Sequence, residues 1–444
     1  MASAAEQLAQ NMNFSALSKA TDLKKRIWFT LGALIIYRLG TYIPLPGIDP
    51  ETFRQIYSSQ SGGVLDMFNA FSGGALERMT IFALNIFPYI SASIIMQLMT
   101  AIVPSIEAMK KEGEAGRKKI NQYTRYGTVL LASVQAYGIA VGLEAAGASG
   151  FGSAVIDPGM FFRISTVITL TGGTVFLMWL GEQITQRGIG NGISLIIFSG
   201  IVANLPLALA EAFSLGQSNG IVAVIILAVP FIIAGIVACE RAHRRVIVQY
   251  PKRQVGNKIF GGDSSHLPIK LNVSGVIPAI FASSLLLMPL SAANLSGAGG
   301  PEWLTWVTAN LGRGSVLYLT AYSLLIAFFA FFYTGIVFNT EETADNLKKH
   351  GGFIPGIRPG ANTAAFLERI INRLTVVGAS YLVAVCLLPE LLITEFNVPF
   401  YFGGTSLLIV VSVTMDTVGQ IHSHLVAHQY EGLIKKSKLK GRRG

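Results

Sequence analysis

Ten apolar runs of about 20 residues dominate this 444-residue sequence. A run of that length crosses a hydrocarbon core of about 30 Å as an α-helix. Only 13% of the residues are charged, whereas soluble domains carry about 25%. The sequence therefore predicts an all-α, polytopic membrane protein. The runs lie approximately at 27–45, 79–103, 127–147, 161–180, 192–211, 220–239, 273–293, 316–338, 374–393 and 401–421.

The lysines lie outside these runs and on every second connection between them. Cytosolic connections retain Lys and Arg, whereas translocated connections lose them. The alternation predicts a multi-pass protein with both termini in the cytosol. The polar stretch 2–21 has no apolar core of a cleavable signal, so the first helix is expected to act as the targeting signal. The lysine clusters are 19–25, 110–119, 252–270, 348–349 and 435–440.

The net charge of +10 is concentrated on the predicted cytosolic face. It suggests anionic lipid headgroups, or an acidic or RNA-bearing partner that docks from the cytosol, although for any one cluster topology alone explains it equally well. Cys239 and Cys386 form no CxxC pattern and are expected to pack as small apolar residues. His422, His424 and His428 have no carboxylate or cysteine beside them, so we expect no metal site and no cofactor.

Residues 62–79 form an apolar stretch that is too short to span a bilayer. Its apolar face, which includes Phe71, ends at Gly73 and Gly74. We expect a short re-entrant or interfacial helix on the outer side, because such backbone survives at membrane depth only if protein buries it or it lines an aqueous cavity. A peripheral amphipathic helix on the outer leaflet is the alternative.

Two cytosolic connections, 240–270 and 339–373, are unusually long and rich in Arg, Lys, Gly and Pro. Connections of more than about 15 residues are usually functional or disordered. In the second, the Pro-Gly pairs of 355–360 predict a tight turn that presents Arg358. We expect rigid projections for a cytosolic partner, with passive linkers as the alternative.

An internal duplication is visible when the runs are compared in order. The pattern P-x-I-x-A-S occurs at 88–93 and 278–283, and G-x-S-L-x-I occurs at 192–197 and 404–409. In both cases the partners are five runs apart. The shared odd offset favours an inverted repeat of five plus five helices, with pseudo-symmetric halves at 1–215 and 216–444.

The sequence offers little for catalysis or ion coupling. It has no Walker A motif, and no Ser/His, paired Asp or HExxH arrangement within the runs, which argues against an intramembrane hydrolase. A secondary transporter would fit the topology, but the run centres are nearly free of ionisable residues. The run centres contain isoleucines instead. Such residues form either an apolar collar that excludes water from a pore by dewetting or ordinary contacts between packed helices.

Several long motifs resemble the SecY family, the central subunit of the bacterial protein-conducting channel, from about Leu23 to the C-terminus. They are FSGGAL at 71–76, ISASI at 90–94, QYTRYG at 122–127, WLGEQIT at 179–185, RGIGNGIS at 187–194, GVIPAIFA at 275–282, ADNLKK at 344–349, PGIRPG at 355–360 and PFYFGGTSLLI at 399–409.

The resemblance implies an hourglass of ten helices with a pore ring, a plug at about 62–76, a lateral gate between the second and seventh helices, and a cytosolic docking site. The implied pore ring is Ile86, Ile90, Ile193, Ile197, Ile280 and Ile409. The implied plug includes Gly63, Leu65, Met67, Phe68, Phe71, Gly73 and Gly74. The implied gate includes Ser91, Gln97, Asn272 and Met288. The implied docking residues are Arg244, Lys252, Arg253, Lys258 and Arg358.

By the same resemblance, the protein would be a passive, non-enzymatic channel in the bacterial cytoplasmic membrane. It would export unfolded chains and insert apolar helices sideways. Expected partners are SecE-like and SecG-like small membrane subunits, the SecA motor ATPase, the ribosome, signal peptides, nascent chains and anionic lipids, with no direct DNA binding. The proline of each gate helix, Pro88 or Pro278, is expected to bend it.

Overall fold

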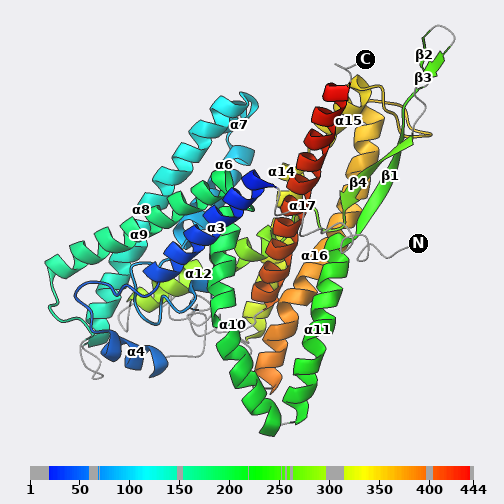
Figure 1. Ribbon diagram of the computed structural model, residues 1–444. Helices are drawn as coiled ribbons and strands as arrows, with labels where there is room; N and C mark the ends of the chain where they lie inside the picture. The colour runs from blue at the N-terminus through cyan, green and yellow to red at the C-terminus, as the bar shows by residue number, and fades with distance from the viewer. Residues whose placement is uncertain are drawn as a thin grey trace.

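Long helices make up most of the computed structural model, which describes residues 20–59, 69, 71–147, 154–218, 220–251, 253–255, 258–260, 264–296, 315–396 and 404–440 (Figure 1). Each of the ten predicted runs overlaps a helix, so the all-α expectation is confirmed. These helices are α3 (Thr21–Gly40), α6 (Phe87–Ile102), α8 (Glu114–Gly147), α9 (Met160–Arg187), α10 (Gly192–Ser218), α11 (Gly220–Arg241), α12 (Ile277–Ser296), α14 (Val316–Val337), α16 (Ala361–Phe396) and α17 (Gly404–Lys440).

Within the described residues, four segments are by themselves long and apolar enough to cross a membrane. A fifth is possible if α6 and the short α7 (Pro104–Lys111), which meet at a bend of 97°, count as one span. The count of ten spans therefore stays a prediction. The four segments are Glu114–Glu144, Met160–Arg187, Val316–Lys349 and Ala361–Pro389.

The prolines of the repeated P-x-I-x-A-S pattern begin helices. Pro88 is the second residue of α6, and Pro278 is the second residue of α12. Proline is favoured in a first helical turn because its missing N–H has no intrahelical partner there. The expectation that these prolines bend the helices is therefore wrong, and α6 starts at Phe87, later than the predicted run.

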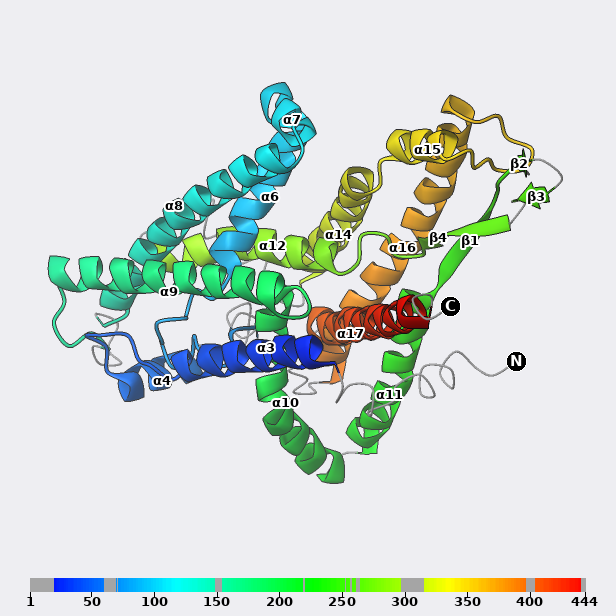
Figure 2. The ribbon, with the colours of Figure 1, turned by 45° about the horizontal axis from the view of Figure 1, so that its top comes forward.

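The helices pack in a continuous assembly (Figure 2). On one side α8 packs against α6 and α9, and α10 packs against α9 and α3. On the other side α14 packs against α12 and α16, and α17 packs against α16 and α11. The two groups meet where α12 contacts α6 and α8, and again where α10 contacts α11 and α17 and where α3 contacts α17.

The long connections contain the non-helical structure. Strand β1 (His243–Gln249) pairs antiparallel with β4 (Ser264–Lys270), and β2 (Arg253–Val255) pairs antiparallel with β3 (Lys258–Phe260). The second connection forms α15 (Thr340–Lys349) and then a turn that leads into α16. Figure 1 shows the strands extending beyond the helix ends close to α15. The short α4 (Pro50–Ser59) lies in the connection after α3.

A central hydrophobic cluster joins both groups of helices. It takes buried side chains from α3, α6, α9, α10, α12, α14, α16 and α17. Cys386 is buried in this cluster, and Cys239 is half-buried in α11; both are free thiols, which agrees with packing roles.

Candidate pore, plug and gate

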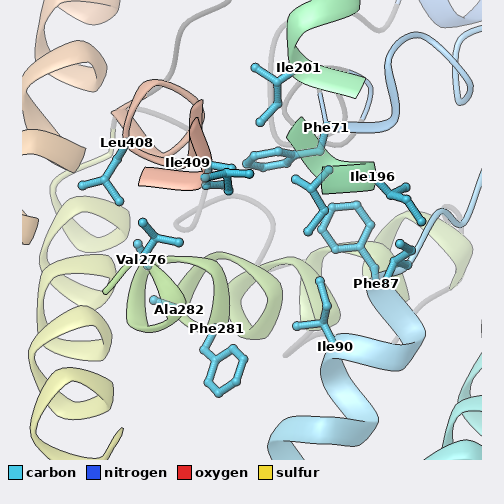
Figure 3. Close-up of a cluster of buried hydrophobic side chains, with 14 of the residues drawn as sticks. Phe71, Phe87, Ile90, Ile196, Ile201, Val276, Phe281, Ala282, Leu408 and Ile409 are labelled. Carbon is cyan, nitrogen blue, oxygen red and sulfur yellow. The ribbon is translucent and has the colours of Figure 1, made fainter. Parts of the chain in front are cut away.

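The six predicted ring isoleucines come together in the central cluster. Ile86, Ile90, Ile197 and Ile409 are buried members of it, and Ile193 and Ile280 are partly buried and pack against it. Five of them lie at the starts of four helices, α6, α10, α12 and α17, and Ile86 immediately precedes α6. Figure 3 shows Ile90 and Ile409 turned toward the same central space, together with Phe71.

Equivalent isoleucines occupy equivalent helix positions. Ile90 is the fourth residue of α6, and Ile280 is the fourth residue of α12. Ile197 is the sixth residue of α10, and Ile409 is the sixth residue of α17. The two helices of each pair, α6 with α12 and α10 with α17, therefore begin at the same position of the repeated sequence pattern.

The end of the predicted plug lies against this cluster. Phe71 is 3% exposed and meets the ring of Phe87 edge-on, with centroids 6.0 Å apart. Helical backbone at 71–72 ends at Gly73 and Gly74, whose φ values are +67° and +84°, a region that favours glycine. The helix end predicted there is confirmed. Gly63, Leu65, Met67 and Phe68 lie outside the described residues.

The described end of the predicted plug, residues 71–74, is called the plug end below, and it approaches α10 without room for a side chain. A Cβ on Gly73 would lie 3.1 Å from the Cα of Gly200, and a Cβ on Gly200 would lie 2.2 Å from the carbonyl oxygen of Phe71. The two backbones are therefore in direct contact. This pairing could not be predicted from the sequence, because Gly200 belongs to an ordinary apolar run.

Two predicted gate residues lie on α6, which packs against α12. Ser91 is half-buried. Gln97 donates from Nε2 to the Oγ of Ser93 at 3.2 Å, while its buried Oε1 has no hydrogen-bond partner among the described residues. Met288 belongs to α12, the helix that packs against α6.

Asn272 anchors the approach to α12 and bonds to α11. It is 4% exposed, and its Nδ2 donates to Oε1 of Glu240 at 2.8 Å and to the carbonyl of Gly275 at 3.0 Å. Burial raises the pKa of the Glu240 carboxyl. The hydrogen bonds of Asn272 thus join the connection 271–276 to α11, whereas Ser91 and Gln97 lie on α6.

The two long connections form one packed unit. Gln249 and Phe353 exchange backbone hydrogen bonds of 2.8 and 2.9 Å. Beside this bridge, Val246, Ile269 and Ile354 form a cluster with residues of α16. Passive linkers would lack such a core, so the structure agrees with rigid projections.

The predicted docking residues lie on this unit. Arg244 is exposed on β1, and Arg253 and Lys258 lie in the β2–β3 hairpin, while Lys252 is outside the described residues. Arg358 is exposed between Gly356 (φ +81°) and Gly360 (φ +107°), so the predicted tight turn is confirmed.

The structure adds polar residues that sequence reasoning did not assign to the site. Arg125 forms two hydrogen bonds with Glu182, of 2.9 and 2.6 Å, and so links α8 to α9. Tyr37, Arg38 and Asn85 bond to the plug end. The QYTRYG and WLGEQIT motifs contain Arg125 and Glu182, which could have signalled a pair, but nothing local marks Tyr37 or Asn85.

Comparison with known proteins gives a consistent result. A family model described as SecY matches residues 80–418. Protein translocase subunit SecY of Rickettsia bellii is 54% identical over 434 residues, covering 97% of this chain and 100% of the relative. Protein translocase subunit SecY of Escherichia coli strain K12 is 51% identical over 435 residues, covering 96% of this chain and 97% of the relative.

Solved structures share the fold. A chain described as a protein-conducting channel superposes with a TM-score of 0.66 at 18% identity, covering 91% of this chain and 93% of that chain. Sec61 from a canine ribosome-channel complex gives a TM-score of 0.61 at 18% identity, with the same coverages of 91% and 93%. The family model, the full-length relatives and the shared fold together establish that this chain belongs to the SecY family.

Proposed function

We propose that this protein is the pore-forming subunit of a protein translocase. It exports unfolded polypeptides across the bacterial cytoplasmic membrane and inserts apolar helices into it. The observation that carries the proposal is the central cluster, where four helices from both sides of the molecule bring six isoleucines together with Phe71. The relatives that match nearly the whole chain are named as translocase subunits, which supports it.

The chain is built from two pseudo-symmetric halves, 1–215 and 216–444. The contacts of α6 with α8, α8 with α9, α9 with α10 and α3 with α10 recur five helices later. There they are α12 with α14, α14 with α16, α16 with α17 and α11 with α17. Even the contact between groups, α10 with α11, has its counterpart in α17 with α3. This repeated pattern supports an inverted duplication with the path between its halves.

The six ring isoleucines form a narrow constriction, called the isoleucine waist below, which seals the pore at rest. Apolar side chains at a constriction exclude water and ions by dewetting, and because they make no directional bonds, they can move aside for a polypeptide of any sequence. Phe71 and the plug close the outer side of this waist. The lateral gate opens between α6 and α12, near Ser91 and Gln97.

Sideways exit follows from transfer energetics. A Leu or Phe at the centre of a membrane helix gains about 0.3–0.6 kcal/mol in lipid, while a central Asp or Lys costs about 2.5–3.5 kcal/mol. Apolar segments therefore leave through the gate, and polar segments cross.

The protein acts as a channel without catalysis, and external partners supply the driving force, since the sequence has no Walker A motif. The exposed Arg244 and Arg358 on the packed cytosolic unit form the docking site for SecA or the ribosome. Two solved structures that share the fold, canine Sec61 and yeast Ssh1, are in complexes with ribosomes, which supports this docking. SecE-like and SecG-like subunits complete the assembly, both termini are cytosolic, and the basic clusters contact anionic lipids.

Crosslinking to a translocating chain tests this function. Single cysteines replace Ile90, Ile280 or Ile409, and an arrested secretory chain carries a photoreactive or thiol probe. We expect adducts at all three positions and none at a cysteine replacing Phe161, which is 87% exposed on α9. Adducts at Phe161 but not at the isoleucines would contradict the proposal.

A further inference from the structure

Three consecutive carbonyls at the end of the plug each accept a hydrogen bond from a side chain outside it. Asn85 Nδ2 donates to the oxygen of Phe71 at 3.1 Å. The hydroxyl of Tyr37 donates to the oxygen of Ser72 at 3.3 Å. Arg38 Nη1 donates to the oxygen of Gly73 at 2.8 Å.

These bonds provide partners for carbonyl groups at the end of a helix. The last carbonyls of a helix lack partners in the helix itself, and residues 71–74 are buried. A buried carbonyl without a partner costs about 1–3 kcal/mol. The donors from α3 and from the turn before α6 therefore replace water. The bond from the Arg38 guanidinium is charge-assisted and should be the strongest of the three.

The three donors are held in position by their own surroundings. Tyr37 is fully buried and stacks on Phe82, with centroids 6.1 Å apart. The guanidinium of Arg38 lies 5.3 Å from the ring centre of Tyr42, and that of Arg78 lies 4.3 Å from the same ring.

Asn85 has a φ of +48°, a conformation that Asn adopts more readily than most residues. Asn85 is also 1% exposed, so its amide is enclosed beside the carbonyl of Phe71.

We propose that Tyr37, Arg38 and Asn85 form a clamp that positions Phe71 in the isoleucine waist and so sets how tightly the resting channel is closed. The inference rests on the proposed function and deepens it. All three are positioning residues: they bind the carbonyl of Phe71 and those of the two residues that follow it, and they leave the Phe71 ring free to pack against the waist. The clamp also explains why α3 carries an arginine in its last turn.

Thiol accessibility of the clamped segment tests the clamp directly. In the full chain, with Cys239→Ser and Cys386→Ala, a Phe71→Cys reporter is exposed to a membrane-impermeant maleimide in proteoliposomes. Tyr37→Phe removes one donor and keeps the ring. Asn85→Gly removes another and suits the positive φ. Arg38→Met removes the third, and Arg38→Lys retains a cationic donor.

We expect each donor loss to speed modification about fivefold to tenfold, as the loss of roughly one hydrogen bond implies. Arg38→Lys should stay within about twofold of the parent. The matched control is Tyr333→Phe in α14, which removes a hydroxyl elsewhere in the helical core and should change nothing. With Phe71 intact, the three donor losses should also raise the resting ion conductance.

Unchanged modification rates in Tyr37→Phe and Asn85→Gly would overturn the clamp, as would equal acceleration in Tyr333→Phe. The two proposals fail separately. If Ile86→Ala with Ile409→Ala conducts ions but donor losses leave the thiol buried, the channel stands and the clamp fails. If donor losses expose the thiol but neither they nor the isoleucine variants conduct, the three donors do hold the segment at Phe71, whereas the proposed channel fails and with it the effect of the clamp on channel closure.

Discussion

The backbone of Gly73, at the end of the plug, lies directly against that of Gly200 in α10. A methyl group on Gly200 would lie 2.2 Å from the carbonyl oxygen of Phe71, which is far inside van der Waals contact. The plug end and α10 can therefore keep this arrangement only while position 200 has no side chain.

Gly200→Ala should accordingly destabilise the resting state. Overpacking of this kind costs about 1–3 kcal/mol, although alanine in an open helical position gains about 0.5–1 kcal/mol over glycine. Gly172→Ala in α9 is the control, because no heavy atom lies within 4 Å of a Cβ there. The melting temperature in detergent should fall for Gly200→Ala. For Gly172→Ala it should rise or stay the same. An increase at both positions would refute the close approach.

Arg358→Glu should weaken docking of the cytosolic driver and leave the membrane domain intact. Arg358 is exposed in a turn fixed by Gly356 and Gly360, so reversing its charge changes the surface and little of the fold. We expect at least a tenfold loss in SecA or ribosome affinity, about 1.4 kcal/mol, measured by binding to proteoliposomes.

The control for this surface is Lys25→Glu on α3, which makes the same charge reversal at another exposed site. It should change affinity much less. Equal losses for both variants would indicate general charge attraction and would remove the specific role of the turn.

Glu240 should make stability depend on pH. Burial raises the pKa of its carboxyl above the ordinary 4.5 and outweighs the hydrogen bond from Asn272 and the charge of Lys270, which lower it, while the charge of Asp416 raises it a little further. The folded protein then holds this proton more tightly than the unfolded chain, so the contribution of Glu240 to stability is complete below pH 4.5. It is lost as the pH rises through the raised folded-state pKa.

Glu240→Gln keeps the oxygen that accepts from Asn272 and removes the ionisation. Its melting temperature should exceed that of the parent at pH 8, and the difference should shrink toward pH 4.5. Glu368→Gln, at an exposed position on α16, should show no such trend. A constant difference across the pH range would rule out ionisation of Glu240 as the cause.

Periodic and local features of the sequence predicted much of the fold. Apolar length located the helices, and the Pro-Gly pairs predicted the turn around Arg358, because both depend on a few neighbouring residues. The start of α6 was placed too early, since the apolar residues 81–86 form turns in which Asn85 has positive φ. Apolar composition does not distinguish a buried turn from a helix.

Contacts between residues far apart in the chain could not be predicted from the sequence alone. Tyr37 is 35 residues from Ser72, and its hydroxyl bond forms only after α3 packs beside the plug end. The pairing of Asn272 with Glu240 likewise depends on the path of the β1–β4 hairpin between them. The isoleucines could be proposed as a set through the repeat, yet their meeting in one cluster required coordinates.

Ion conductance in planar bilayers tests the isoleucine waist most directly. Ile86→Ala with Ile409→Ala shortens two buried members of the central cluster, and Leu45→Ala with Leu170→Ala removes the same number of buried carbon atoms from a separate core that includes Phe162. Each buried truncation costs about 2–5 kcal/mol of stability, so the double leucine variant controls for destabilisation. We predict a resting ion leak in the isoleucine variant and none in the leucine variant. A folded isoleucine variant that remains as ion-tight as the parent would contradict the account.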